Sequence, residues 1–362
     1  MAAGSMAQWG NDLYTGRRSY KIVQRRALWF WITGALVALS LLVLGTKGFN
    51  LGIDFEGGSE FTITNIDNPS QDKAVDAVQS VAPSEEPEVV NLGSNGLQVR
   101  TGTLSKDETD QVKTALAKTF DVDAAKDVGA EFIGPTWGSD VSKKAIEGVI
   151  AFVLLVAAFM AIYFRNWRMS LAAIIALMAD LVISAGVYAV VGWEVTPSTV
   201  IGFLTILGYS LYDKVVVFDK VRENTAGIVD QTRATYAERA NLAVNQTLVR
   251  SINTGVVALL PVGGILFVGG FLLGAGTLRD IALSLFVGIA VGTISSIFLA
   301  TPLEVTLRER EPAIKANTAK ILAARAQAAE QGDDPDLVAS VGSAQLQPGA
   351  HQGIKAQPRR KR

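Results

Sequence analysis

The amino-acid sequence predicts a polytopic α-helical membrane protein with six transmembrane helices and one small α+β domain outside the membrane. The mean hydropathy is +0.30 and only 19% of the 362 residues are charged, a balance that is unusual for a water-soluble chain. A membrane-spanning helix needs about 20 mostly apolar residues, and polar segments separate six such runs. These runs are 27–45, 146–164, 169–191, 198–218, 252–273 and 281–303.

The composition excludes several classes of chemistry. There is no Cys, so the chain has no disulfide, thiolate nucleophile or Cys-based zinc site. The only histidine, His351, lies in a polar tail, so we expect neither a His-ligated metal nor a Ser-His-Asp triad. Gly-Lys does not occur, which excludes a Walker A loop. We therefore expect no metal, no cofactor and no conventional enzyme activity.

The first apolar run, at 27–45, follows a basic segment, residues 1–26. A positively charged start resembles a signal peptide, but the run is too long for an h-region and has no convincing A-x-A cleavage site. We therefore interpret 27–46 as an uncleaved first transmembrane helix. The bases before it are Arg17, Arg18, Lys21, Arg25 and Arg26.

The polar stretch at 47–142 is long enough for a small folded domain. Its patterns predict a strand at 59–64, a helix at 71–81, a strand at 89–101, an amphipathic helix at 106–119 and a strand near 127–133. This order suggests helices on one face of a sheet, and a ferredoxin-like fold is one arrangement that fits. The strand order does not follow from the sequence.

The distribution of charge predicts the orientation. Residues 48–140 contain 17 acids and 6 bases, a net charge of −11. By the positive-inside rule the segments rich in Lys and Arg are cytoplasmic, so the acidic domain is outside and both termini are inside. The bases that mark the inner connections are Arg165, Arg168, Lys220, Arg222, Arg233 and Arg239.

Two further segments lie around helices two to six, which occupy 143–305. Residues 220–250 are predicted to form an amphipathic helical segment near the membrane surface. The cytoplasmic tail, 306–362, begins with an Ala-rich helix at 313–329 and ends in a polar, disordered stretch. Its final basic cluster, Arg359 to Arg362, indicates a solvated tail, with contact to membrane lipids or ribosomal RNA as the alternative; no specific nucleic-acid site is expected.

Three ionisable residues at membrane depth are candidates for a function: Asp213 in the fourth run, Asp180 in the third and Arg250 just before the fifth. Each costs roughly 2.5–3.5 kcal/mol to insert, which favours a functional role. Because low dielectric favours the protonated carboxyl and a nearby arginine favours the ionised one, the three predict a proton relay. The alternatives are structural hydrogen bonds for the aspartates and snorkelling for Arg250. Glu147 and Glu194, at the ends of runs, are expected to be solvated.

Small residues are frequent in the last two runs. Gly288 and Gly292 are four positions apart and share one helix face, which permits close backbone approach. Ser295 and Ser296 follow one turn later. We predict a tightly packed helix interface here; an interface that moves is the alternative.

Four motifs occur in order along the chain: G-I-D-F-E-G-G at 52–58, G-Y-S-L-Y-D-K-V-V-V-F-D-K-V-R-E-N at 208–224, S-I-N-T at 251–254 and G-T-I-S-S-I-F-L-A-T-P-L at 292–303. Together with the six apolar runs they resemble the SecD/SecF family of protein-export membrane proteins, of the RND superfamily. The resemblance covers about residues 20–310, and the second motif is similar to that of the SecF branch.

The resemblance implies an RND-type membrane fold and a role in the Sec pathway of protein export. It implies SecD as a partner, association with the SecYEG channel and SecA, contact with exported unfolded chains, and use of the proton-motive force. The rival interpretations are an RND-like exporter of small molecules and a scaffold subunit without an active ion path. Sodium is an alternative to the proton as coupling ion, because carboxylate and hydroxyl oxygens suit both.

The resemblance also assigns roles to single residues. Asp213 takes the position of the family's proton-relay aspartate, and Arg250 falls near its span-five basic residue. Asp180 matches an acid in span three without an assigned role. Hinge positions are matched by Asp54, Gly57 and Gly58, and the span-four and span-five motifs include Tyr209, Ser210, Asn253 and Thr254.

Lys214 departs from the family pattern, which often has Thr after the aspartate. Neighbouring helix residues point about 100° apart, so we expect Lys214 to extend toward the inner surface. If it instead faced the same cavity as Asp213, it would weaken that carboxylate's hold on a proton.

Overall fold

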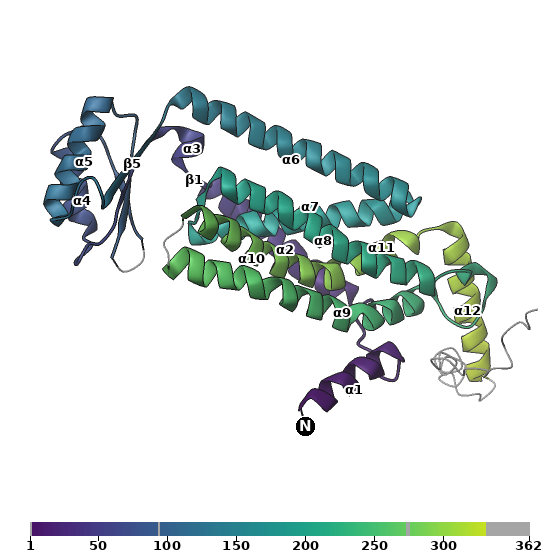
Figure 1. Cartoon of the computed structure of the whole chain (residues 1–362). Helices are drawn as coiled ribbons and strands as arrows, with labels where there is room; N and C mark the ends of the chain where they lie inside the picture. The colour runs from purple at the N-terminus through teal and green to yellow at the C-terminus, as the bar shows by residue number, and fades with distance from the viewer. Residues whose placement is uncertain (1, 93–94, 273–275, 331–362) are drawn as a thin grey trace, which may run out of the picture.

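The computed structural model describes residues 2–92, 95–272 and 276–330, and it consists of a helical bundle with a small α+β domain at one end (Figure 1). Six helices in these ranges are long and apolar enough to cross a membrane, as predicted. They are α2 (Arg26–Thr46), α6 (Pro135–Phe164), α7 (Trp167–Val191), α8 (Pro197–Asn224), α9 (Tyr236–Gly264) with the π-helical η2 (Ile265–Leu272), and α10 (Gly276–Ser295), which continues through the π-helical η3 (Ser296–Ala300) into α11 (Thr301–Arg308).

Local sequence signals fix where three of these helices begin. Asn166 accepts hydrogen bonds from the backbone N–H groups of Arg168 and Met169 and so caps α7. Thr196 forms a capping box at the start of α8, with Pro197 at the first helical position, and Thr235 forms one with Glu238 at the start of α9. These side chains satisfy N–H groups that the first helical turn leaves unpaired.

The segment 220–250, predicted as amphipathic and helical, is helical for most of its length but is divided between two membrane helices. Helix α8 continues to Asn224, a short 3₁₀ turn follows at η1 (Ile228–Asp230), and α9 begins at Tyr236. The Thr235 cap divides the segment, and residues 236–250 are the first four turns of span five. The apolar side chains of residues 236–250 pack against the bundle, so this part of the chain does not lie along the membrane surface as its polar residues suggested.

The outer domain contains β2 (Gly58–Ile63), α4 (Gln71–Gln79), β3 (Glu88–Asn91), β4 (Leu97–Thr101), α5 (Lys106–Phe120) and β5 (Val128–Ile133). Its strands form an antiparallel sheet in the order β3-β4-β2-β5, which is the ferredoxin-like arrangement. The single strand predicted at 89–101 was wrong, because the chain reverses between β3 and β4. Gly, Ser and Asn between them provide a turn signal, and the Leu92 N–H donates to the Gly96 carbonyl at 2.8 Å.

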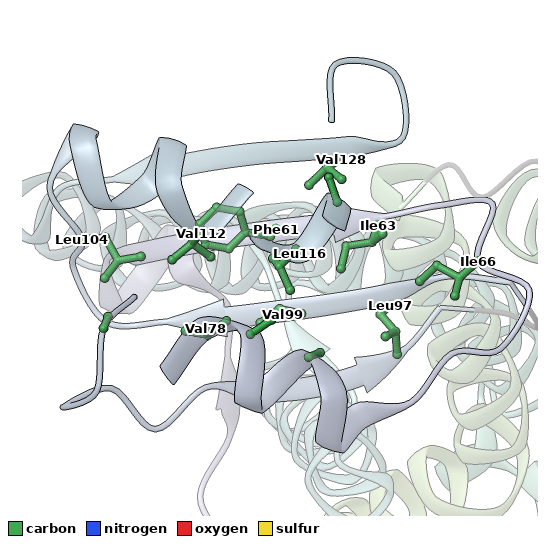
Figure 2. Close-up of a cluster of buried hydrophobic side chains, with 14 residues drawn as sticks. Phe61, Ile63, Ile66, Val78, Leu97, Val99, Leu104, Val112, Leu116 and Val128 are labelled. Atoms are coloured by element: carbon green, nitrogen blue, oxygen red, sulfur yellow. The ribbon is translucent and has the colours of Figure 1, made fainter. Parts of the chain in front are cut away.

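The core of this domain lies between the sheet and its two helices (Figure 2). Phe61 and Ile63 of β2 pack against Val112 and Leu116 of α5, and all four side chains are fully buried. Because successive strand residues point to opposite faces, Glu60 faces the other side. That face carries the polar residues and is turned toward the membrane bundle.

Two helices lie outside the six spans. Helix α1 (Ala2–Tyr14), which the sequence analysis did not predict, packs along α9, and Gly10 lies against Val249. Helix α12 (Pro312–Glu330) lies at the end of the bundle opposite the outer domain (Figure 1). The predicted disordered stretch and the basic cluster at Arg359 to Arg362 lie outside the described residues.

Candidate functional site: a buried polar centre and an outer junction

Asp213 lies where three membrane helices meet. Its side chain is almost completely buried. The Ser251 hydroxyl of α9 donates to its Oδ1 at 2.9 Å, and the Ser296 hydroxyl, at the first residue of η3, donates to its Oδ2. The carboxylate is thus held by hydroxyl groups alone among the described residues, with no cation bonded to it.

Glycines allow the helices around this centre to approach closely. A Cβ on Gly292 of α10 would lie 2.8 Å from the Ser210 Oγ of α8, and a Cβ on Gly288 would overlap the Ile206 side chain. The structure therefore places both glycines of the G-x-x-x-G pair against α8. Their missing side chains bring the α10–η3 helix within reach of Asp213.

Lys214 and Asp180 form a second, separate centre. The Lys214 Nζ lies 2.6 Å from the Asp180 Oδ2, and both side chains have no exposed surface. Ser210 donates to the same oxygen at 2.5 Å and accepts a hydrogen bond from Lys214 at 2.5 Å. The expectation that Lys214 reaches the inner surface was wrong, and it does not pair with Asp213 either. It lies one turn after Ser210 on the side of α8 that faces α7, where Asp180 supplies the opposite charge.

Arg250 is not brought to Asp213. Its side chain is exposed on the bundle surface, and its Nη2 donates to the Tyr212 hydroxyl at 3.4 Å. The next residue, Ser251, makes the contact with Asp213 instead. Ser296 was predicted to pack and Ser251 had no predicted role. Their position within two motifs, together with the hydrogen-bonding capacity of Ser, is the signal that could have identified them.

The other motif residues lie around these two centres. Thr254 donates to the Arg250 carbonyl at 2.8 Å, and Asn253 is exposed beside it. Tyr209 is half-buried on α8. Ser295 is buried, and its hydroxyl has no hydrogen-bond partner within the ranges described.

A line of polar residues connects Asp180 with the outer end of the bundle. Asp180, Ser184 and Tyr188 recur every four residues on α7, so they share one face, and all three are buried. The Tyr188 hydroxyl donates to the Asp280 carbonyl at 3.5 Å. Asp180 Oδ1 and Ser184 Oγ have no hydrogen-bond partner among the residues described. The four-residue spacing of Asp180, Ser184 and Tyr188 is present in the sequence, but only Asp180 was predicted to have a role.

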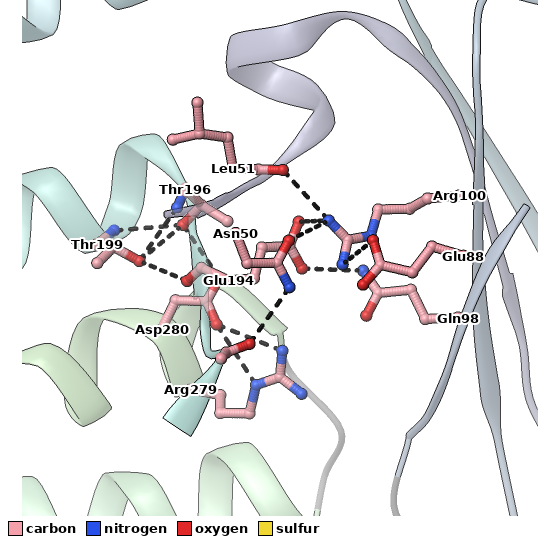
Figure 3. Close-up of polar contacts among 11 residues, drawn as sticks. Asn50, Leu51, Glu88, Gln98, Arg100, Glu194, Thr196, Thr199, Arg279 and Asp280 are labelled. Atoms are coloured by element: carbon pink, nitrogen blue, oxygen red, sulfur yellow. Dashed lines mark hydrogen bonds and ion pairs between the residues drawn. The ribbon is translucent and has the colours of Figure 1, made fainter. Parts of the chain in front are cut away.

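The outer domain is joined to the bundle by polar contacts (Figure 3). Strand β1 (Asn50–Leu51) pairs in parallel with β6 (Glu194–Val195), which lies between α7 and α8. Arg100 of β4 reaches across the junction: its guanidinium lies 3.6 Å from Glu194 and donates to the Asn50 Oδ1 at 3.2 Å and to the Leu51 carbonyl at 3.3 Å. This buried arginine therefore ties the sheet to the membrane helices, and Gln98 of the same strand also donates to Glu194, at 3.4 Å.

Glu194 was expected to be solvated, and this was wrong. Its side chain is 12% exposed, because the outer domain covers it. This burial raises the pKa of Glu194 to about 7, although the attraction of Arg100 lowers it. The residue lies at the end of a span, as the sequence indicates, but the fold places a protein surface over it.

Glu194 belongs to a cluster of acids around a cavity of about 260 Å³ between the sheet and the bundle. Burial raises the pKa of Asp54 and of Glu60, with a smaller contribution from neighbouring acids such as Glu131. Asp280 completes the cluster and accepts a hydrogen bond from Thr196 at 3.1 Å. Across the described ranges, no group of three or more His, Cys, Asp or Glu side chains is arranged to hold a metal ion.

The turn at residues 54–58 connects β2 with the membrane-side elements. Asp54 lies in the one-turn helix α3 (Ile53–Glu56), and Gly57, with a φ of 79°, ends that helix. Gly58, with a φ of 133°, begins β2, and a Cβ there would lie 2.5 Å from the Thr101 carbonyl oxygen. Both positions thus require glycine. The turn packs against α6, where Gly138 lies close to the Phe55 backbone.

Comparison with known proteins gives a consistent result. The family model for the SecD/SecF C-terminal region of protein export membrane proteins matches residues 111–310, and the SecD/SecF GG motif matches residues 42–64. Protein translocase subunit SecF of Streptomyces coelicolor is 47% identical over 92% of this chain and 89% of its own length. The SecF of Mycobacterium tuberculosis is 43% identical over 89% of this chain and 74% of its own.

A solved structure agrees with these sequence matches. The crystal structure of SecDF from Thermus thermophilus, described as a translocon-associated membrane protein, superposes with a TM-score of 0.71 and 31% identity. The match covers 81% of this chain, but this chain spans only 39% of the SecDF chain. From the fold, the motifs and these relatives, the chain belongs to the SecF family of protein translocase subunits.

Proposed function

We propose that this chain is an accessory subunit of the Sec protein-export machinery that works with SecD and uses the proton-motive force to promote translocation across the cytoplasmic membrane. The proposal rests on one observation: Asp213 is buried between three helices and bonded only to hydroxyl groups among the described residues. A hydroxyl donates to a carboxylate and accepts from a carboxylic acid. The Ser251–Asp213–Ser296 site therefore suits both protonation states.

Protonation of Asp213 changes what holds the three helices together. The ionised carboxylate accepts from Ser251 on α9 and from Ser296 at the start of η3. Once protonated, it needs only one of these donors and offers a proton of its own. Because Ser296 begins a π-helical segment, a geometry often found at functional sites, we place the movement at the contact between α8 and the α10–η3 helix.

The same two helices reach the outer junction. Asp280 near the start of α10 binds Thr196, which caps α8, and Glu194 two residues before that cap binds Arg100 of the outer domain. A shift of α10 along α8 therefore changes the contacts that hold the outer domain's sheet to the bundle. The glycine turn at 57–58 is the hinge about which the outer domain responds, and the domain engages the exported unfolded chain.

The face around Arg250 supports SecD as the partner. A guanidinium exposed at membrane depth is costly, and here it lies beside Tyr212 and Asn253 on the outside of the bundle. A second membrane subunit packed on this face would remove the cost and bring Arg250 into the proton path.

The remaining partners and the orientation follow from the same proposal. SecYEG and SecA supply the channel and the ATP-driven step. The basic inner connections and the net charge of −11 on residues 48–140 support an orientation with both termini in the cytoplasm and the acidic domain outside. The chain then works as a non-enzymatic subunit of a bacterial cytoplasmic membrane.

The test is gradient-driven export in inverted membrane vesicles after ATP-dependent insertion has been stopped. Asp213→Asn should abolish the response to an imposed proton gradient, because an amide cannot bind and release the proton. Asp219→Asn is the matched control on the same helix, since Asp219 is partly exposed and bonded to Tyr163. Co-purification with SecD shows that each variant still assembles.

If the assembled Asp213→Asn variant responds to the gradient like the wild type, the relay assignment fails and a scaffold role remains. Replacing the proton gradient with a sodium gradient identifies the coupling ion. We expect export to follow the proton gradient.

A further inference from the structure

A cavity of about 660 Å³ opens beside the inner half of the bundle, between the α1–α2 connection and the helices α2, α9 and α10–η3. This volume is in the range of small-molecule binding sites. Neither the relay nor the outer junction uses it. One of its walls is formed by the apolar residues Leu248, Ile252, Ile294 and Ile297.

Another part of the lining carries positive charge and aromatic rings. Lys21 and Arg25 line the cavity, and neither forms an ion pair with an acid in the part of the chain that the structure describes. Trp9 and Trp29 line it too, and the Trp29 Nε1 is a buried donor with no hydrogen-bond partner in those ranges. Two unpaired cations and an unused N–H beside an apolar wall match a ligand with an anionic head and an apolar tail.

This basic wall is held in place by hydrogen bonds. The Asn245 Oδ1 accepts from the Tyr20 N–H at 2.7 Å, and the Asn241 Oδ1 accepts from the Ile22 and Val23 N–H groups at 3.0 Å each. Both asparagines also donate to the Tyr20 carbonyl at 3.0 Å. The backbone on both sides of Lys21 is therefore fixed to α9, so the cavity is built before a ligand arrives.

The position of the cavity across the membrane indicates which leaflet supplies the ligand. Lys21 and Arg25 immediately precede α2 on the side that the charge distribution makes cytoplasmic. Aromatic rings gather at the same level: the Trp9 Nε1 donates to the Tyr20 hydroxyl at 3.1 Å, and Trp29 packs on Phe298 with ring centroids 4.2 Å apart. Basic clusters at this surface attract the anionic lipids of the inner leaflet.

We propose that this cavity binds one anionic phospholipid, with its phosphate at Lys21 and Arg25 and an acyl chain along Leu248, Ile252 and Ile297. The site also borders the Asp213 centre, whose role as a proton relay rests on the proposed function. Ile252 follows Ser251 and Ile297 follows Ser296, the two residues that bind Asp213. A bound lipid thus supports, from behind, the wall that holds the relay carboxylate.

The experiment measures lipid binding to the full chain by native mass spectrometry, with phosphatidylglycerol and phosphatidylcholine as probes. Quenching of tryptophan fluorescence by acyl-brominated phosphatidylglycerol gives a second readout. The wild type should retain phosphatidylglycerol in preference to phosphatidylcholine. The double variant Lys21→Gln/Arg25→Gln should bind phosphatidylglycerol about thirtyfold more weakly, from the loss of two basic contacts.

The matched control is Arg17→Gln/Arg18→Gln, which removes the same charge from exposed residues that do not line the cavity. It should bind like the wild type. Ile252→Trp, at a partly exposed position of the apolar wall, should fill the cavity and weaken binding without changing any charge.

Three outcomes would overturn the proposal: equal losses in both double variants, equal retention of the two lipids by the wild type, or release of the lipid when SecD is added. The first means diffuse surface attraction, and the last assigns the cavity to a protein partner. Asp213→Asn should bind the lipid normally, so a failure of the relay hypothesis is distinguishable from a failure of this one.

Discussion

The buried pair of Lys214 and Asp180 gives the sharpest test of how the bundle is held together. Asp180→Asn keeps the shape of the side chain but removes its charge. The Lys214 ammonium, 2.6 Å away and without exposed surface, then has only neutral oxygens as partners, from Ser210 and the new amide, and no opposite charge. Removing one end of a buried ion pair costs about 3–5 kcal/mol, so we expect the single variant to lose stability by this amount.

The double variant Asp180→Asn/Lys214→Met should recover most of that loss. Methionine replaces the lysine stem with a side chain of similar length and no charge, so no unpaired ion remains in the bundle. Replacing a buried pair by well-packed apolar residues of similar volume is often neutral or stabilising, and the Ser210 hydroxyl, which bonds Asp180 in the wild type, is a partner for the new amide. We expect the double variant to lie within about 1 kcal/mol of the wild type, with a coupling energy of about 2–4 kcal/mol between the two sites.

The assay is unfolding in mixed micelles by titration with sodium dodecyl sulfate, followed by circular dichroism. Glu147→Gln is the control, because its ion pair with Lys144 on α6 is exposed at both ends and contributes at most about 1 kcal/mol. The reasoning is refuted if Asp180→Asn is no less stable than Glu147→Gln, or if the double variant is as unstable as the single one. The double variant should keep gradient-driven export, because Asp213 has partners of its own.

Three further predictions concern the junction, the outer core and the helix contact. Burial raises the pKa of Glu194 from 4.5 to about 7. The contribution of Glu194 to the stability of the contact between the outer domain and the bundle is therefore complete below about pH 4.5 and is lost as the pH rises through 7. Glu194→Gln should make amide exchange at Leu51 less dependent on pH, and an unchanged pH dependence would contradict this. Leu116→Ala removes a fully buried side chain and should destabilise the outer domain by about 2–5 kcal/mol in thermal unfolding, whereas the exposed Thr119→Ala should change stability by less than about 0.5 kcal/mol. Gly292→Ala places a methyl group 2.8 Å from the Ser210 hydroxyl oxygen and should impair gradient-driven export. The control Gly264→Ala places its methyl group in open space and should leave export unchanged. Equal export by both variants would argue against a close α8–α10 contact in the mechanism.

Much of the fold was predictable because it depends on local composition. An apolar run of sufficient length crosses a membrane whatever lies beside it, so the six helices followed from hydropathy. The starts of three of them follow from the capping residues Asn166, Thr196 and Thr235. The outer domain's strands and helices also followed from periodicity, apart from the reversal between β3 and β4. There the apolar pattern continues through a turn, and periodicity alone does not separate two strands from one.

The polar partners were decided by the tertiary structure. The sequence by itself determined that Asp213 and Asp180 lie at membrane depth, where each needs a partner. It could not determine which one, because the 100° step of a helix gives the direction of a side chain relative to its own helix and not the identity of the helix opposite. Packing of α7, α9 and η3 around α8 decided that Lys214 binds Asp180, that Asp213 binds two serines, and that Arg250 stays outside.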